Sequence, residues 1–517
     1  MLKLHSKKMK FRIDKIWLLI LFTTFIRIFI ALTLDFGNDE VYYWTYARHL
    51  DWNYFDHPPV VAWLIRLTTL NLSLHNELSA RFGAILSSAI CTFIIYKTGV
   101  LIHNKRSGWY AALLYSASFY CSIIAGAFIL PDSPQMVFWL LGLLILIKID
   151  KSTINESKNS LLWICFGIVT GLCIMCKVHG VFLWLAVALY AVIWSPAWWR
   201  NPWMYLSGII TLLIISPIVI WNFQNHFITY AYHGARVAPT SGFNPIAFFR
   251  EIFGELFYNN PFVFLLAWGA VWSWHKSRLV IAKKELGLLI CYSLPLIVTL
   301  FFLASFRTTL PHWSGPAYSV LILIIAVKLT NYTNRKANRI VICSLGFYLV
   351  IVVAGLLMVN FYPGTLSPSN DPKIVGKGDV TLDLYGWEDA GQQFEKLYQN
   401  DIKKGRILGH EPIIINKWFP AAHIDFYLAS MTKQQTYGIG PIFDLHQYYF
   451  YNKYHQKPIK GADAYYITSS NMFSQQDIDF NKAYFEKIED PVFLPIKRNG
   501  KICKNLVIYK LRRFKGF

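Results

Sequence analysis

Residues 35–66 read DFGNDEVYYWTYARHLDWNYFDHPPVVAWLIR and lie between the first two long apolar runs of the chain. This stretch combines five carboxylates, two histidines, many aromatic side chains and the step Pro58-Pro59. Acidic groups beside a lipid bilayer are costly to desolvate, so their crowding here favours a functional loop. The alternative is a solvated interfacial loop rich in Tyr and Trp, and the rest of the chain decides between the two.

The composition is that of a polytopic α-helical membrane protein. Of the 517 residues, 55% are hydrophobic and 17% aromatic, which is too apolar for a soluble chain of this length. A basic start leads into the apolar run 16–34 without a small-residue cleavage site, which predicts a membrane anchor and no cleaved signal peptide. The apolar runs predict about eleven transmembrane helices, near residues 16–34, 78–102, 108–126, 134–149, 161–177, 180–198, 203–221, 261–275, 286–305, 313–329 and 339–361.

The positive charge follows the predicted topology. The net charge is +21, and Lys and Arg are concentrated in segments that alternate helices place on one side, at 1–15, 103–106, 148–158, 200, 276–285 and 328–339. Basic loops stay on the cytoplasmic side of a membrane, so the sequence predicts a cytoplasmic N-terminus and a C-terminus on the outer, periplasmic face. Because the charge is explained by topology, nucleic-acid binding is excluded as a function class.

The composition changes after Tyr362, where FYPGTLSPSNDPK reads as a linker. The sequence predicts a membrane domain at 1–361, with a periplasmic first loop at 35–77, and a soluble periplasmic α/β domain at 362–517. Amphipathic helices are expected at 388–403, 420–429 and 475–488, between β-like runs EPIIINKW, QQTYGIG, ADAYYITSS and LVIYKLR. Cys503 is the single cysteine after 362, so no disulfide staples this domain, and Cys173 and Cys176 are expected to be packing residues.

Polar clusters gather on the predicted outer side. They are the first loop, LPDSP at 130–134, CKVHG at 176–180, WNFQNH at 221–226 continuing to Arg236, and RTTLPHW at 307–313. The inner loops, such as HNKR and NRKANR, are plain basic linkers. Polar groups that several helix ends bring to one face predict a single cavity at the outer membrane interface.

The side chains of these clusters suit sugar transfer from a lipid phosphate. Asp39, Glu40, Asp56 and Asp132 offer bases or acceptors that orient a hydroxyl group. Cations for a phosphate come from Lys177 and Arg307, with His57, His312, His179 and Arg236 as further candidates. A carboxylate takes the proton of the attacking hydroxyl, while the cations stabilise the charge on the departing lipid phosphate.

The motifs NDEVYYWTYARHLDWNYFDHPP, LPDSP, CKVHG and RTTLPHWSGP, in this order, resemble the GT-C membrane glycosyltransferases. The chain is most similar to the dolichyl-phosphate-mannose protein mannosyltransferase family, and within it to the bacterial branch that modifies lipid A with undecaprenyl-phosphate sugars. The resemblance covers residues 10–361. It implies that Asp39 of the acidic pair Asp39-Glu40 is the catalytic carboxylate, and that Lys177 and Arg307 bind the donor phosphate.

The resemblance also assigns roles to the remaining motifs. The aromatic–acid–base–Pro-Pro motif falls on Tyr54 to Pro59, where relatives often carry Glu-Lys in place of Asp56-His57, so a fixed positive charge at His57 is in question. Asp132 matches the acidic site between the third and fourth spans. Each residue also has a structural alternative: Asp39 and Asp132 as helix caps, His57 as a loop residue, and Lys177 and Arg307 reaching from helix ends to lipid headgroups.

The sequence therefore predicts a glycosyltransferase of the bacterial inner membrane with a polyprenyl-phosphate sugar donor. The acceptor is lipid A or another envelope glycolipid, and the wider family makes Ser or Thr of exported proteins the alternative. A flippase for a lipid-linked sugar would need polar residues along a path through the bilayer, and a glycan ligase or polymerase would need a diphosphate-linked donor. No cofactor is expected and no metal site stands out, although the acids could hold a divalent cation at the donor phosphate.

Overall fold

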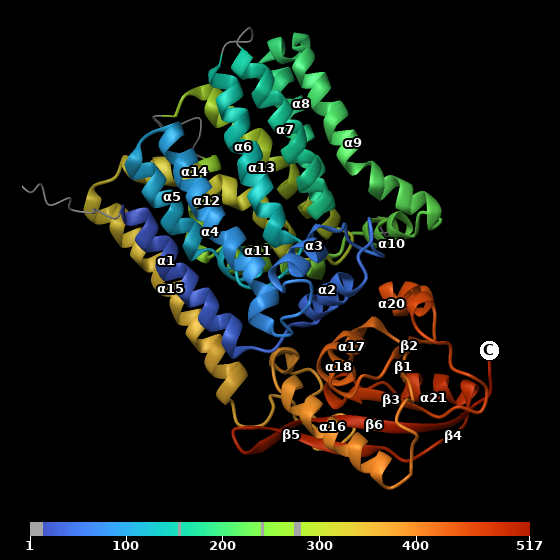
Figure 1. Cartoon of the computed structure of the whole chain (residues 1–517). Helices are drawn as coiled ribbons and strands as arrows, with labels where there is room; N and C mark the ends of the chain where they lie inside the picture. Colours follow the sequence, from blue (N-terminus) through green and yellow to red (C-terminus); the bar gives the residue numbers. More distant parts are fainter. Residues whose placement is uncertain (1–13, 153–156, 239–241, 273–280) are drawn as a thin grey trace, which may run out of the picture.

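The computed structural model describes residues 14–152, 157–238, 242–272 and 281–517. Parts of the predicted cytoplasmic segments 1–15, 148–158 and 276–285, and the end of the predicted span 261–275, lie outside the described residues. The described chain forms a bundle of long helices and a separate C-terminal domain built around a sheet (Figure 1).

Each predicted apolar run coincides with a helix. These helices are α1 (Lys15–Thr33), α4 (Glu77–Ile102), α5 (Lys105–Ala117), α6 (Asp132–Lys151), α7 (Ser157–Cys176), α8 (Phe182–Ile193), α9 (Pro202–Gln224), α12 (Pro261–Trp272), α13 (Lys283–Ala304), α14 (Gly315–Thr330) and α15 (Asn334–Phe361). Within the described residues, eight helices are long and apolar enough to cross a membrane, counting η4 (Pro311–Ser314) together with α14 as one. The helices α8, with the short η2 (Val178–Val181) before it, and α12 are apolar but shorter.

The predicted third span at 108–126 differs from a single straight helix. Helix α5 ends at Ala117, Ser118 adopts an extended backbone, and η1 (Tyr120–Ile124) follows as a short helix with wider turns. The break frees backbone groups at a helix end, and Ser118 Oγ accepts a hydrogen bond from the Cys121 backbone N–H at 3.3 Å. After the break, η1 lies close to the start of α6, since the Tyr120 hydroxyl donates to Asp132 at 2.9 Å.

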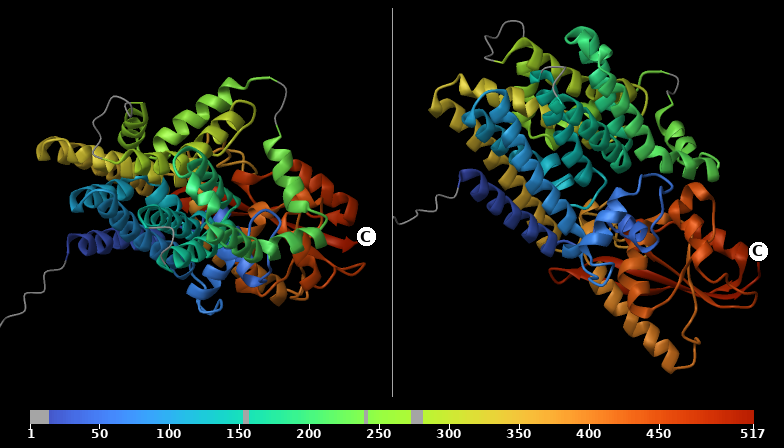
Figure 2. Two further views of the ribbon diagram at one scale, coloured as in Figure 1. Left: turned by 90° about the horizontal axis from the view of Figure 1, so that it is seen from above. Right: turned by 45° about the horizontal axis from the view of Figure 1, so that its top comes forward.

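Among the described residues before the C-terminal domain, four α-helices lie outside the predicted spans, namely α2 (Asn38–Arg48), α3 (Val60–Thr68), α10 (Ile228–Val237) and α11 (Pro245–Tyr258). Helices α2 and α3 belong to the first loop and lie between the bundle and the C-terminal domain, while α1 and α15 run side by side along one flank (Figures 1 and 2). Glu40 stabilises the start of α2. Its carboxylate reaches back three residues and accepts a hydrogen bond from the Gly37 backbone N–H at 3.0 Å.

The C-terminal domain follows α15, which ends at Phe361. Its helices are α16 (Trp387–Lys403), α17 (Trp418–His423), α18 (Ser430–Thr432), α19 (Ile442–Leu445), α20 (Gln447–Tyr451) and α21 (Gln475–Tyr484). Its strands are β1 (Ile413–Ile415), β2 (Thr436–Gly438), β3 (Ala464–Ser469), β4 (Phe485–Ile488), β5 (Val492–Arg498) and β6 (Lys501–Phe514). The strand order is β2-β1-β3-β6-β4, with β5 also paired to β6. Strands β2, β1 and β3 are parallel, and β6 pairs antiparallel with β3, β4 and β5.

The predicted α/β character and the four predicted strands agree with this sheet, with two differences. The helix expected at 475–488 ends at Tyr484, and Phe485–Ile488 is strand β4 because it pairs with β6. Strand β5 was not expected from the sequence. It alternates weakly and contains Pro495, which suits an edge strand because proline offers no N–H to a further neighbour.

The first loop is fastened to the C-terminal domain. The Trp387 backbone N–H donates to Asp35 Oδ2 at 2.7 Å, and the Phe36 N–H donates to the Tyr427 hydroxyl at 2.8 Å. Arg48 forms an ion pair with Asp425 at 2.5 Å. One buried core cluster contains side chains of both parts, so the loop and the domain share a core.

Candidate active site

A cavity of about 160 Å³ lies where the first loop, the ends of the membrane helices and the C-terminal domain meet. It is lined by residues of every region that the sequence singled out on the outer side, together with two residues of the C-terminal domain. They are Asp39, Tyr43, Asp56, His57, Leu130, Pro131, Asp132, Lys177, Tyr232, His233, Arg236, Leu310, His312, Trp313, Trp418 and His446. The structure therefore brings Asp39 and Lys177 to one chamber on one side of the bundle.

Asp39 stands in the first turn of α2 with its carboxylate exposed to this cavity. Within the described residues the carboxylate makes no hydrogen bond and no ion pair. The surrounding protein raises the pKa of Asp39 to about 6, first by desolvation and then through the negative charge of Asp56. An unpaired carboxylate with such a pKa is ionised at neutral pH and ready to accept a proton.

The neighbouring Glu40 has a different environment. It is buried, and both of its oxygens accept hydrogen bonds from Arg81, at 2.8 and 2.7 Å. Glu40 also accepts the backbone N–H of Ile129 at 3.0 Å, just before the Leu130–Asp132 segment of the cavity wall. Because every oxygen of Glu40 is engaged, this residue is suited to position α2 and α6 rather than to exchange protons with a substrate.

Asp56 and His57 line the cavity from the loop before α3. Asp56 accepts hydrogen bonds from the Tyr46 and Tyr42 hydroxyls, and desolvation raises its pKa to about 6. Burial and the neighbouring His233 and Lys177 hold the pKa of His57 well below its usual value. His57 is therefore a neutral imidazole at physiological pH, which can donate a hydrogen bond to a phosphate but supplies no positive charge.

Asp132 and Lys177 form an ion pair at the cavity wall. Lys177 Nζ donates to both Asp132 oxygens at 3.0 and 2.8 Å, and Tyr120 donates its hydroxyl to Asp132 at 2.9 Å. Both charged side chains are buried. The ammonium group has three N–H donors, so it can bind an anion in the cavity while it keeps its contact with Asp132.

Of the two arginines that the sequence offers as phosphate ligands, one lines the cavity and the other does not. Arg236 of α10 lines the cavity, with its guanidinium 5.3 Å from the Tyr232 ring centre and 5.7 Å from that of Trp313. Arg307 does not line the cavity and donates from Nε to the Ala238 carbonyl at 2.5 Å. The expectation that Arg307 binds the donor phosphate thus does not fit its position, because its guanidinium holds the end of the helix that carries Arg236.

The remaining histidine candidates divide in the same way. His312 lines the cavity and packs on Tyr258 at 5.8 Å between ring centres. His179 lies behind the wall against Trp313, at 5.7 Å. In the described parts of the chain, no group of three or more His, Cys, Asp or Glu side chains is arranged to hold a metal ion.

A second and larger cavity, of about 540 Å³, opens beside the first. The two share Asp39, Leu130, His312 and Trp418, so Asp39 lies at their junction. The larger cavity is walled by apolar side chains of the bundle, including Ile124 and Phe128, and by residues 380–384 of the C-terminal domain. A substrate in each cavity would therefore meet at Asp39.

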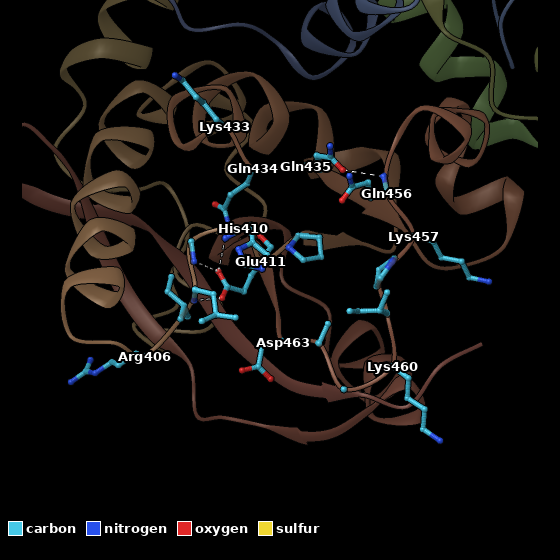
Figure 3. A pocket seen from close by; sticks show the side chains of 18 of the residues that line it. Arg406, His410, Glu411, Lys433, Gln434, Gln435, Gln456, Lys457, Lys460 and Asp463 are labelled. Carbon is cyan, nitrogen blue, oxygen red and sulfur yellow. Dashed lines mark hydrogen bonds between the residues drawn. The ribbon is translucent and has the colours of Figure 1, made fainter.

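A third hollow, of about 930 Å³, lies in the C-terminal domain at the ends where strands β1, β2 and β3 begin (Figure 3). Lys433, Lys457 and Lys460 border it, but their side chains point outward from it. Its carboxylates are already engaged: Glu411 accepts three backbone N–H groups, and Asp463 pairs with Arg512 at 2.7 Å. Both acids among the described residues that line this hollow therefore already have partners.

The sequence reasoning missed several residues of this region, among them Arg81, Trp418 and His446. Arg81, a lone arginine early in an apolar helix, was a signal, since a buried charge requires a partner. Trp418 and His446 had no signal, because only the docking of the C-terminal domain brings them to the cavity.

Known proteins resemble this chain in sequence and in fold. The family model described as dolichyl-phosphate-mannose-protein mannosyltransferase matches residues 56–221. An undecaprenyl phosphate-α-4-amino-4-deoxy-L-arabinose arabinosyl transferase of Proteus mirabilis is 23% identical over 57% of this chain and 54% of its own length. A lipid A galacturonosyltransferase of Rhizobium johnstonii is 22% identical over 68% of this chain and 70% of its own length. The chain thus spans little more than half of the first of these relatives.

The solved structures cover more of the chain. ArnT of Cupriavidus metallidurans bound to undecaprenyl phosphate aligns with a TM-score of 0.62 at 13% identity, over 96% of this chain and 98% of its own. An oligosaccharyltransferase of Archaeoglobus fulgidus, in complex with a peptide and a dolichol-phosphate, aligns with a TM-score of 0.52 over 93% of this chain and 73% of its own. The chain therefore has the fold of the GT-C membrane glycosyltransferases and resembles the lipid A aminoarabinose transferases among them.

Proposed function

We propose that this protein is a glycosyltransferase of the bacterial inner membrane that takes a sugar from an undecaprenyl-phosphate donor. Lipid A, or another envelope glycolipid, is the proposed acceptor, and the active site faces the periplasm. The names of the relatives and the shared fold support the reaction class. The observation that carries the proposal is that Asp39 and Lys177 line one cavity, where the Asp39 carboxylate has no partner among the described residues and the Lys177 ammonium is buried.

The distribution of basic residues supports the orientation. Arg106, in the first turn of α5, donates to the Thr330 and Tyr332 carbonyls at 3.3 and 3.1 Å, so the predicted basic segments 103–106 and 328–339 meet at one end of the bundle. Helix α6 begins in the cavity with Asp132 and ends at Lys151, which pairs with Glu285 at 2.7 Å. The basic end is thus opposite to the cavity end, and the positive-inside rule assigns the basic end to the cytoplasm.

The reaction can be followed atom by atom. The acceptor oxygen forms a bond to the anomeric carbon of the sugar, and the bond from that carbon to the phosphate oxygen breaks. The donor phosphodiester carries one negative charge, whereas the departing undecaprenyl phosphate carries up to two. Lys177 and Arg236 stabilise the additional charge, and a preorganised cation in a cavity is most effective where charge develops.

Asp39 acts at the attacking group. If the acceptor is a hydroxyl, Asp39 takes its proton as the new bond forms. If the acceptor is a phosphate of lipid A, that oxygen is already ionised and Asp39 takes no proton from it. In that case the Asp39 carboxylate accepts a hydrogen bond from a hydroxyl group beside the reacting atoms and so orients the substrates. The larger cavity, which shares Asp39 with the smaller one, provides the approach for the acceptor.

The test compares Asp39→Asn with Asp51→Asn in cells that lack the chromosomal copy. Asp51 is a carboxylate of the same loop that lies outside the cavity, and it accepts the Trp52 backbone N–H at 2.7 Å. Mass spectrometry of envelope lipids should find the sugar-modified lipid A with the wild type and with Asp51→Asn, and none with Asp39→Asn. Full modification by Asp39→Asn would remove the proposed role of Asp39. Unchanged lipid A together with altered glycoproteins would show that the acceptor is a protein and not lipid A.

A further inference from the structure

The C-terminal domain contributes two ring side chains to the wall of the small cavity. Trp418 is the first residue of α17, and His446 lies between α19 and α20. Both residues lie more than 200 positions after Lys177 in the sequence, so their presence beside the lysine depends on domain docking.

These rings are held firmly against the first loop. His446 stacks on Phe55 at 4.5 Å and on Trp418 at 5.4 Å between ring centres, with interplanar angles of 27° and 20°. The next residue, Gln447, accepts the Phe55 backbone N–H with its side-chain oxygen at 2.8 Å and donates its own N–H to the Tyr42 hydroxyl at 3.1 Å. These contacts therefore fix the position of the two rings relative to the loop that carries Asp39 and Asp56.

The backbone of His446 is strained. Its φ of 50° and ψ of −126° lie in a region that glycine adopts readily and other residues rarely adopt. Such a conformation is unfavourable for a residue with a side chain, and it persists only where the surrounding structure enforces it. The chain keeps a histidine there, 95% buried, with its ring at the cavity wall.

The proposed position of the donor phosphate determines which part of the donor lies against these two rings. Lys177 and Arg236 line the same small cavity, and the sugar of the donor is bonded directly to the phosphate they would bind. A sugar ring has an apolar C–H face, which packs on an aromatic ring, and hydroxyl edges, which need hydrogen-bond partners. Burial lowers the pKa of His446 to about 4, so its imidazole is neutral and can both donate and accept.

We infer that Trp418 and His446 form the binding surface for the sugar ring of the lipid-linked donor, so that the C-terminal domain completes the donor site. This inference rests on the proposed function, because it takes the lipid phosphate to lie at Lys177 and Arg236. Trp418 also borders the larger cavity, which places the sugar at the junction where Asp39 acts.

The test separates the sugar from the phosphate by measuring binding of three lipids to the purified full-length protein. The lipids are undecaprenyl phosphate, undecaprenyl phosphate-4-amino-4-deoxy-L-arabinose and undecaprenyl phosphate-galacturonic acid. The wild type should bind at least one sugar-bearing lipid more tightly than undecaprenyl phosphate. Trp418→Ala and His446→Asn should each weaken that lipid about tenfold and leave the affinity for undecaprenyl phosphate unchanged.

The control is Tyr449→Ala, which removes an aromatic ring from α20 that is 51% exposed and lies outside the cavities described above. His446→Gly adds a second check, because glycine relieves the backbone strain while it removes the imidazole. It should fold as stably as Tyr449→Ala, judged by thermal unfolding, and still bind the sugar-bearing lipid weakly.

Three results would overturn the inference: an equal loss of affinity for undecaprenyl phosphate, no loss in either cavity variant, or a wild type that gains nothing from either sugar. A failure of this inference can be distinguished from a failure of the proposed function. Sugar-dependent binding at Trp418 without any transfer by the wild type would contradict the enzyme proposal and leave this binding surface in place. Transfer that depends on Asp39 but not on Trp418 or His446 would support the proposed function and contradict this binding surface.

Discussion

Two hollows of this molecule differ in an instructive way. The hollow in the C-terminal domain measures about 930 Å³ and is bordered by several lysines, whereas the cavity at Asp39 measures about 160 Å³. In the larger hollow the lysine side chains point outward, and Glu411 and Asp463 are engaged by backbone N–H groups or by arginine (Figure 3). In the smaller cavity Lys177 is buried, and the carboxylate of Asp39 has no partner among the described residues.

The difference shows that volume and nearby positive charge do not identify the reaction site. Lysines on the rim of a hollow stay solvated, so they carry no desolvation penalty. Water and salt screen their interaction with an anion, which is therefore weak. A buried lysine and an unpaired carboxylate make the folded state less stable, and such groups are found at sites where chemistry requires them. The predictions that follow test this contrast, beginning with the largest expected effect.

Replacing Lys177 by Met should reduce transfer by a factor on the order of 10²–10³, because the departing phosphate loses its buried cation. The same change at Lys460, on the rim of the larger hollow, should leave the rate unchanged. The measurement is the rate of sugar transfer by each purified variant in lipid vesicles. A strong loss in Lys460→Met, with a normal rate in Lys177→Met, would move the phosphate site to the C-terminal domain.

Arg236 and Arg307 provide a closer comparison. Arg236→Gln should lower the rate at saturating donor at least tenfold, because its guanidinium lines the cavity. Arg307→Gln should have a smaller effect, since its guanidinium holds the Ala238 carbonyl and acts on the cavity only through the position of α10. Steady-state kinetics with varied donor concentration distinguishes the two. A larger loss in Arg307→Gln would restore the role that the sequence assigned to it.

The pH dependence gives the smallest effect. Desolvation and the charge of Asp56 raise the pKa of Asp39 to about 6, and a general base works only when it is ionised. If the acceptor is a hydroxyl, kcat/KM should fall as the pH decreases through about 6. Asp56→Asn removes the neighbouring negative charge, which lowers the pKa of Asp39 and moves this limb to lower pH.

The reference for this experiment is the pH profile of the wild type between pH 5 and 8. Asp56 also lines the cavity, so the absolute rate of Asp56→Asn can decrease, and only the position of the limb is informative. An acidic limb that stays in place or moves to higher pH in Asp56→Asn would show that Asp39 is not the group that titrates. A profile without an acidic limb would favour the orienting role, as expected for a phosphate acceptor.

The membrane part could be anticipated because its signals are local. Apolar runs of sufficient length predicted the positions of the helices, and polar motifs at their ends predicted a common site. Asp39, Asp56, His57, Asp132, Lys177 and His312 all line the cavity. The break after Ala117 was not visible, because apolar residues continue on both sides of it.

The remaining features depend on tertiary packing. Arg236 and Arg307 look alike in sequence, and only the path of α10 along the cavity decides which one faces it. Glu40 and Asp39 are adjacent acids, and the choice between them follows from Arg81, which lies on another helix and forms an ion pair with Glu40, whereas the described residues offer Asp39 no such pair. Trp418 and His446 reach the site only after the sheet domain has docked on the first loop.

A cryo-EM structure with bound undecaprenyl phosphate tests the central claim most directly. The account predicts that the phosphate lies in the small cavity, within hydrogen-bond distance of Lys177 Nζ and the Arg236 guanidinium, with Asp39 beside the position of the sugar. A phosphate bound instead among Lys433, Lys457 and Lys460, with the small cavity unchanged, would contradict it.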